Sequence, residues 1–188
     1  TEGASGGIFL PSTNKSELFY AIAVLNSKLS FYICHSLNST YNTEVGDLKR
    51  IPFVLAKDNS LKKIVSCSQL NTEIKKYLTK FSMCEPNFEY SPLSFFKSIN
   101  DIKQRARAYF NYENNLQTQI LINEAIIDEK IFDTYELTPA DKAMVLAKEG
   151  GNIGKLPVSA NSRVAYLAED ESIKEFPLAN KREFIESL

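Results

Sequence analysis

The sequence predicts an α+β fold that is predominantly helical, with a few short strands and one long helix over about residues 101–135. Apolar residues recur at steps of three and four over several long stretches, which is the period of an amphipathic helix. Short apolar runs that end at proline or turn-forming residues are typical of strands. The 188 residues are 44% hydrophobic and 24% charged, a composition typical of globular proteins.

The first 55 residues predict one short strand, one helix, a tight turn and an extended segment. Residues 7–11 read as a strand stopped by proline, and the apolar spacing over 15–37 predicts an amphipathic helix. Residues 38–42 are turn formers that end this helix. Residues 45–48 predict a tight turn, and the apolar run at 51–55 predicts an extended, buried segment after it.

The rest of the chain, from about residue 58, predicts mostly helices. One begins near residues 58–60, and its apolar stripe continues to about Phe81. Residues 84–100 contain two prolines and predict an irregular connection before the long helix. Thr138 and Pro139 form a helix start, with a cap followed by proline at the first position, and this helix should stop at Gly150. One more short helix is expected around 161–169.

Three segments follow from this pattern: residues 1–82, a helical extension over 83–137, and a helical tail over 138–188. Residues 1–82 carry ten Lys or Arg against six Asp or Glu, and residues 83–188 carry 12 against 17. A basic front part suits a nucleic-acid face, and an acidic back part suits protein docking. Ordinary scatter of charges explains so small an asymmetry equally well.

The sequence contains no complete catalytic motif. A glycine-rich turn for S-adenosylmethionine and an Asn/Asp-Pro-Pro-aromatic loop are both missing. The 151–156 stretch departs from a phosphate loop at two required positions. The Asp-Glu-Lys letters at 128–130 resemble part of a nuclease motif, but they fall in a helical stripe and predict a solvated helix face. Cys34 and His35 are neighbours on a helix and point about 100° apart, so they cannot pair.

The cysteines indicate a reducing compartment. Cys34, Cys67 and Cys84 are far apart, so we expect reduced thiols that act as small core residues in a cytoplasmic protein, and no metal site. The chain has no apolar run of about 18 residues, which predicts no membrane partner. It begins with Thr1 and a glycine-rich stretch, and we expect it to be a piece of a longer protein.

Four short sequence motifs between residues 25 and 52 resemble motifs of a known protein family. They are Leu-Asn-Ser-Lys at 25–28, Leu-Asn-Ser-Thr-Tyr-Asn at 37–42, Gly-Asp-Leu at 46–48, and Ile-Pro at 51–52. In this order and spacing they resemble the target-recognition region of bacterial adenine-specific DNA methyltransferases. The nearest likeness is to the methylases of BREX phage defence and of type II restriction-modification systems. The specificity subunits of type I systems are more distant.

The resemblance extends more weakly to about residue 137, where the chain resembles the helix that follows the recognition region in these enzymes. Ser39 stands where the family has proline, and Thr43 and Glu44 replace the usual Phe-Gln. These departures fall in the turn expected to approach DNA, so contacts to the target cannot be transferred residue by residue.

By this resemblance, residues 1–82 are the end of a target-recognition domain and 83–137 a spacer that docks on a catalytic domain. The implied function is DNA target recognition and docking for an N6-adenine methyltransferase, non-catalytic in this fragment. The implied partners are duplex DNA and the methyltransferase catalytic domain of the same parent chain. The fragment itself holds no cofactor, and S-adenosylmethionine belongs to the absent catalytic domain. The alternative is a helical protein–protein interaction domain without DNA contact.

The candidate DNA-binding residues are of two chemical kinds. Cations neutralise phosphates: Lys28, Lys49, Arg50, Lys62 and Lys63. Amides and hydroxyls bond base edges or sugars: Asn38, Thr40 and Asn42. In a turn, residues of the second kind more often bond their own backbone, so both interpretations of them stay open. Asn26 and Ser27 are expected to pack and cap, and Gly46 and Asp47 to serve the turn.

Overall fold

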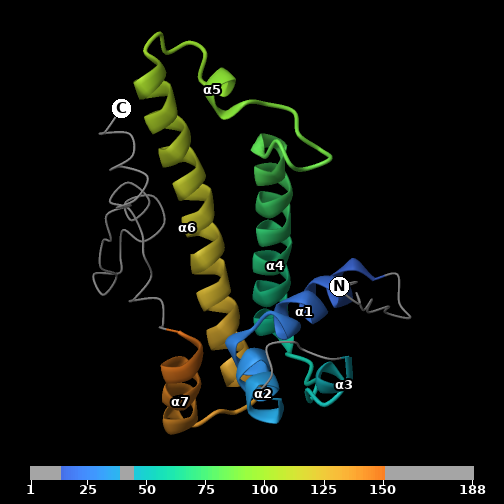
Figure 1. Cartoon of the computed structure of the whole chain (residues 1–188). Helices are drawn as coiled ribbons and strands as arrows, with labels where there is room; N and C mark the ends of the chain where they lie inside the picture. Colours follow the sequence, from blue (N-terminus) through green and yellow to red (C-terminus); the bar gives the residue numbers. More distant parts are fainter. Residues whose placement is uncertain (1–13, 39–44, 151–188) are drawn as a thin grey trace. The chain divides into compact units, whose positions relative to one another are not determined.

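The computed structural model of the chain describes residues 14–38 and 45–150, and every regular element in these ranges is a helix (Figure 1). The elements are α1 (Lys15–Leu25), α2 (Lys28–Leu37), α3 (Val45–Leu48), α4 (Asp58–Leu78), the 3₁₀ turn η1 (Thr79–Phe81), α5 (Pro92–Phe95), α6 (Ile102–Thr134) and α7 (Pro139–Glu149). The chain divides into two compact units. Of the described residues, the first unit holds 14–38, 45–69 and 124–150, and the second holds 70–123.

The predicted α+β class is wrong, because no strand occurs in the described ranges. One predicted strand, residues 7–11, lies outside them. The segment after Ile51 links α3 to α4 without forming a strand. It is also less buried than predicted: Phe53, Val54 and Leu55 are 54%, 41% and 57% exposed, while Ile51 and Ala56 are buried.

Two tyrosine hydroxyls take the place of a partner strand. The Tyr20 hydroxyl donates to the Val54 carbonyl (2.6 Å) and accepts from the Ala56 amide (2.9 Å). The Tyr135 hydroxyl donates to the Pro52 carbonyl (2.5 Å) and accepts from the Val54 amide (3.3 Å). Each hydroxyl therefore bridges a carbonyl and the amide two residues further on. Backbone groups that a sheet would pair are satisfied here by side chains from α1 and from the end of α6.

The helix predicted over 15–37 is two helices. The Asn26 side chain donates to the Ile22 carbonyl (2.8 Å) at the end of α1. The Ser27 hydroxyl accepts from the Ser30 amide (3.2 Å) and donates to the Val24 carbonyl (2.7 Å), so it caps the start of α2. Side-chain bonds of this kind compete with the helix and break it. The capping roles predicted for Asn26 and Ser27 are confirmed.

The other helix predictions are confirmed more closely. Helix α4 begins at Asp58, α6 covers Ile102–Thr134, and the connection between them is irregular apart from η1 and α5. The start of α7 is a capping box in which Thr138 and Asp141 bond each other's backbone amides. The helix stops at Gly150, whose φ of +111° favours glycine. Residues 161–169 lie outside the described ranges.

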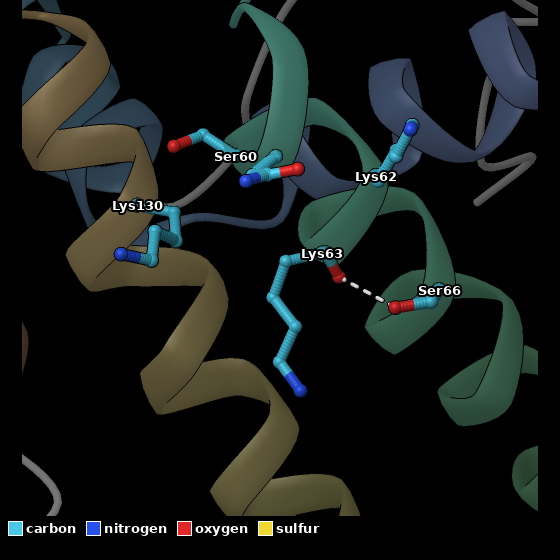
Figure 2. A pocket seen from close by; sticks show the side chains of 6 residues that line it. Ser60, Lys62, Lys63, Ser66 and Lys130 are labelled. Atoms are coloured by element: carbon cyan, nitrogen blue, oxygen red, sulfur yellow. Dashed lines mark hydrogen bonds between the residues drawn. The ribbon is translucent and has the colours of Figure 1, made fainter.

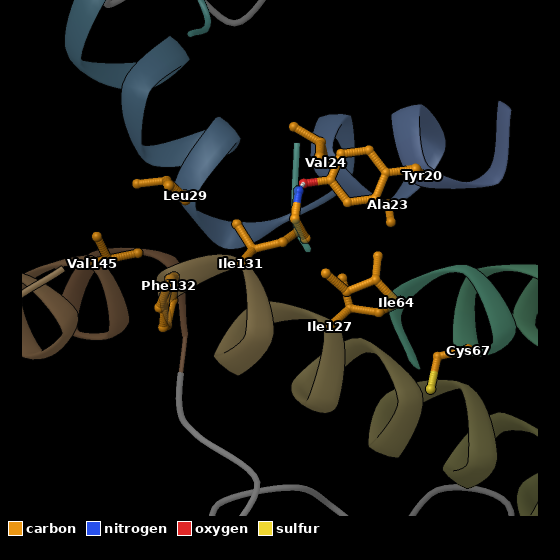
Figure 3. Close-up of a cluster of buried hydrophobic side chains, with 11 residues drawn as sticks. Tyr20, Ala23, Val24, Leu29, Ile64, Cys67, Ile127, Ile131, Phe132 and Val145 are labelled. Atoms are coloured by element: carbon orange, nitrogen blue, oxygen red, sulfur yellow. Dashed lines mark hydrogen bonds between the residues drawn. The ribbon is translucent and has the colours of Figure 1, made fainter. Parts of the chain in front are cut away.

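A single core holds the first unit together (Figure 3). It draws on five helices, α1, α2, α4, α6 and α7, and on Ala56 at the end of the segment that precedes α4. Its buried members are Tyr20, Ala23, Val24, Leu29, Ala56, Ile64, Cys67, Ile127, Ile131, Phe132 and Val145. Cys34 and Cys67 are buried, as expected for thiols in the core, but Cys84 is exposed.

The second unit has aromatic packing and a buried polar pair. The Phe81 ring lies 5.2–6.1 Å from the ring centroids of four other aromatic residues: Tyr77, Tyr90, Phe95 and Tyr109. The buried amides of Asn71 and Asn123 bond each other at 2.7 Å, and Asn71 also donates to the Ile120 carbonyl (3.4 Å). The two buried side-chain amides, one from α4 and one from α6, thus satisfy each other.

We predict that Tyr20→Phe lowers the free energy of unfolding by about 1–3 kcal/mol, because it leaves the buried Ala56 amide without its acceptor. Tyr135→Phe should cost less, since the groups it bonds are exposed and water can replace the hydroxyl. Urea unfolding of both variants measures the difference. Equal losses for the two would contradict the bridging role of Tyr20.

Candidate nucleic-acid interface

Lys28 is bonded to Asp128 through both its side chain and its backbone. Its ammonium lies 2.5 Å from Asp128 Oδ2, and its backbone amide donates to Asp128 Oδ1 (2.9 Å). Asp128 from α6 therefore sits at the first turn of α2, where a carboxylate is favoured by the helix dipole. Asp128 is only 5% exposed, so the prediction that this position is a solvated helix face is wrong. Binding a phosphate with Lys28 would require breaking this pair.

The three candidate amides and hydroxyls divide by position. The Asn38 side chain donates to Asp47 Oδ2 (3.0 Å), which joins the end of α2 to α3. This contact fits the interpretation in which the amide bonds its own chain. Asp47 is 8% exposed and its carbonyl accepts from the Arg50 amide, as expected for a residue that serves the turn. Thr40 and Asn42 lie outside the described residues.

Lys49 and Arg50 follow α3 directly and are exposed. Within residues 14–38 and 45–150, neither side chain forms an ion pair. Two long cationic side chains are therefore free to meet an anion. The sequence placed them after a Gly-Asp turn, and the structure places them after one turn of helix.

A hollow lined by three lysines and three uncharged polar residues forms at the beginning of α4. It has a volume of about 580 Å³ and is open to solvent. Figure 2 shows that its lining comes from α4 and from Lys130 of α6. The lining residues are Asn59, Ser60, Lys62, Lys63, Ser66 and Lys130. None of the six is an acid.

The three ammonium groups of the hollow carry no counter-charge within the described residues, because Lys62, Lys63 and Lys130 form no ion pair there. The first turn of α4 adds the positive end of a helix dipole. The Ser60 hydroxyl and the Asn59 amide can donate hydrogen bonds of the type that phosphate oxygens accept, whereas the Ser66 hydroxyl donates to the Lys63 carbonyl (2.9 Å, Figure 2). The hollow is chemically suited to an anion with several oxygens, such as a phosphodiester.

Part of this site could not be found by reading along the chain. The sequence predicts Lys62 and Lys63 as DNA contacts, but it assigns Lys130 to a solvated helix face with no binding role. Asn59 and Ser60 were interpreted only as a helix start. The α6 lysine joins the α4 residues because the first unit's core packs Ile127 and Ile131 with Ile64, a contact between segments far apart in sequence.

The structure also bears on the neighbouring Cys34 and His35. His35 Nδ1 lies 3.0 Å from Glu149 Oε1 of α7. Burial raises the pKa of the Cys34 thiol, and the charge of Asp47 adds to this effect. A raised pKa disfavours the thiolate, which is the nucleophilic form. Neither residue is therefore arranged for nucleophilic catalysis with the other.

Comparisons with protein-family models, with curated proteins and with solved structures gave no match. Among the described helices, none combines the length and apolar character that crossing a membrane requires.

We predict that the Lys28–Asp128 pair has a measurable pH signature. Burial raises the pKa of Asp128, and its bonds to Lys28 oppose this shift. A raised folded-state pKa means that the stabilisation is complete below the unfolded pKa of about 3.9 and is lost as pH rises through the folded value. The contribution of Asp128 to the free energy of unfolding should therefore decline with rising pH in this window, by at most about 1.4 kcal/mol per pH unit.

Asp128→Asn should remove this contribution, and Lys28→Ala should enlarge it, because the ammonium that opposes the shift is lost while the backbone bond to the carboxylate stays. Urea unfolding at a series of pH values between about 3.5 and 6.5 brackets the window above the reference pKa. Parallel curves for the wild type and Asp128→Asn would contradict the assignment.

Proposed function

We propose that this chain is a DNA target-recognition and docking module of an N6-adenine DNA methyltransferase from a phage-defence or restriction-modification system. Catalysis and S-adenosylmethionine belong to a catalytic domain elsewhere in the parent protein. The sequence words at residues 25–52 suggest this class. The observation that carries the DNA-binding part is the hollow beside the first turns of α4, whose six lining residues include three lysines and no acid.

The chemistry of the hollow matches the DNA backbone better than a base edge. Lysine is a point charge on a flexible stem, which suits phosphate and carries no sequence information. Binding would release counterions and weaken steeply as salt rises. Lys49 and Arg50 are further exposed cations in the same unit, and Lys28 is left out because it is paired with Asp128. The resemblance makes the turn at residues 38–42 the candidate for contacts with DNA bases. Two of its candidate residues, Thr40 and Asn42, lie outside the described residues.

The competing function is a helical protein-interaction module. It is favoured by the apolar surface of Phe53, Val54 and Leu55, since exposed neighbouring apolar side chains often mark a contact site. A DNA-binding measurement on the whole chain decides whether the DNA-binding function is present.

We predict that the 188-residue chain binds a mixed-sequence duplex of 30 base pairs at low salt. The variant Lys62→Ala/Lys63→Ala/Lys130→Ala should weaken binding, and its slope of log K against log salt should fall by up to about 3 because up to three phosphate contacts are lost. Fluorescence anisotropy at several salt concentrations measures both quantities.

A matched control removes three exposed lysines that do not line the hollow: Lys15→Ala/Lys76→Ala/Lys97→Ala. It makes the same change in net charge, so it should retain most of the affinity and slope if the hollow is the contact. Equal loss in the two variants would indicate a diffuse charge effect and contradict the assignment of the hollow. Absence of binding at low salt would contradict the proposed function.

A further inference from the structure

The extended segment between α3 and α4 has one satisfied edge and one open edge. The groups bonded to tyrosine hydroxyls belong to Pro52, Val54 and Ala56. In extended backbone the amide and carbonyl of one residue point to the same edge, and successive residues point to opposite edges. The two-residue repeat of the tyrosine bonds is the repeat of such an edge. The backbone groups of Phe53 and Leu55 therefore point to the other edge.

That other edge has no partner in the described part of the chain. The amides and carbonyls of Phe53 and Leu55 form no hydrogen bond there. The side chains of Phe53, Val54 and Leu55 are each at least 41% exposed. Folded proteins usually cover or charge such an edge, because it is a template for another strand.

The charged residues on either side of the 52–56 segment indicate what kind of strand could bind its open edge. Lys49 and Arg50 precede the segment, Lys57 follows it, and all three are exposed. None of these side chains forms an ion pair with a described residue. A strand laid along the open edge would bring its two ends beside these cations. Acidic ends would be attracted and basic ends repelled.

We propose that the open edge of residues 52–56 is a docking site for an extended strand of a partner protein, apolar in its middle and acidic at both ends. Main-chain bonds to Phe53 and Leu55 hold the strand, and its apolar side chains cover those of the segment. The tyrosines fix the receiving backbone from behind, so little ordering is needed when the partner binds. This inference does not depend on DNA binding.

The test uses the full chain and a synthetic peptide, Glu-Glu-Val-Thr-Val-Thr-Val-Glu-Glu with blocked ends. A matched peptide has lysine in place of every glutamate. Amide hydrogen exchange, followed by NMR, should slow at Phe53 and Leu55 when the acidic peptide is added, with Val54 and Ala56 as internal references. The acidic peptide should bind at least about tenfold more tightly than the basic one at low salt, since several ion pairs act together.

The variant Leu55→Pro removes an open-edge amide and leaves the amides of Val54 and Ala56 in place. Proline is tolerated at an edge whose amide faces solvent, so the melting temperature should change little while peptide binding is lost. Failure of the acidic peptide to bind, or binding that Leu55→Pro leaves intact, would overturn the proposal.

Slow exchange at Phe53 and Leu55 without peptide would also overturn it. If that protection is independent of concentration, a segment of the same chain covers the edge. If it grows with concentration, a second copy does.

Discussion

The tyrosine hydroxyl bridges are the interactions on which the arrangement of the first unit depends. Tyr20 is 1% exposed, and its ring belongs to the core while its hydroxyl reaches the backbone of Val54 and Ala56. The segment held in this way leads directly into α4, which carries most of the basic hollow. Because the hydroxyls replace a strand, the backbone is fixed without a sheet and its far edge stays open.

The cations of the first unit are sorted by their carboxylate neighbours. Lys28 is matched by Asp128, and Lys142 lies within 3.7 Å of Glu129 and 2.7 Å of Asp133. Lys62, Lys63 and Lys130 have no such match in the described residues. A polyanion bound at the hollow would supply the negative charge that no described carboxylate supplies to these lysines.

Sequence periodicity and end signals located α4, α6 and α7, because the determinants of a helix lie within a few residues of one another. The strand prediction failed for a non-local reason. The backbone of the apolar run at 51–55 is bonded by the side chains of Tyr20 and Tyr135, which lie 34 residues from Val54 and 83 residues from Pro52 in the sequence and belong to no strand. The break at Ser27 was visible as a capping residue, although the apolar spacing continues across it.

The candidate site shows the same division. Lys62 and Lys63 could be named from the sequence because they flank an apolar stripe on one helix. Lys130 could not, since it enters the hollow only through the packing of α6 residues with Ile64. Lys28 appeared equivalent to the other lysines, and only the contact with Asp128, 100 residues away, distinguishes it.

The most direct test of the DNA-binding account is an NMR titration of the full chain with a short duplex, following backbone amides along the sequence. If DNA binds at the hollow, the largest shift changes should occur at residues 59–66, around Lys130, and at Lys49 and Arg50. These changes should become smaller as salt is added. Shift changes confined to residues 70–123, or none at low salt, would contradict the DNA-binding account.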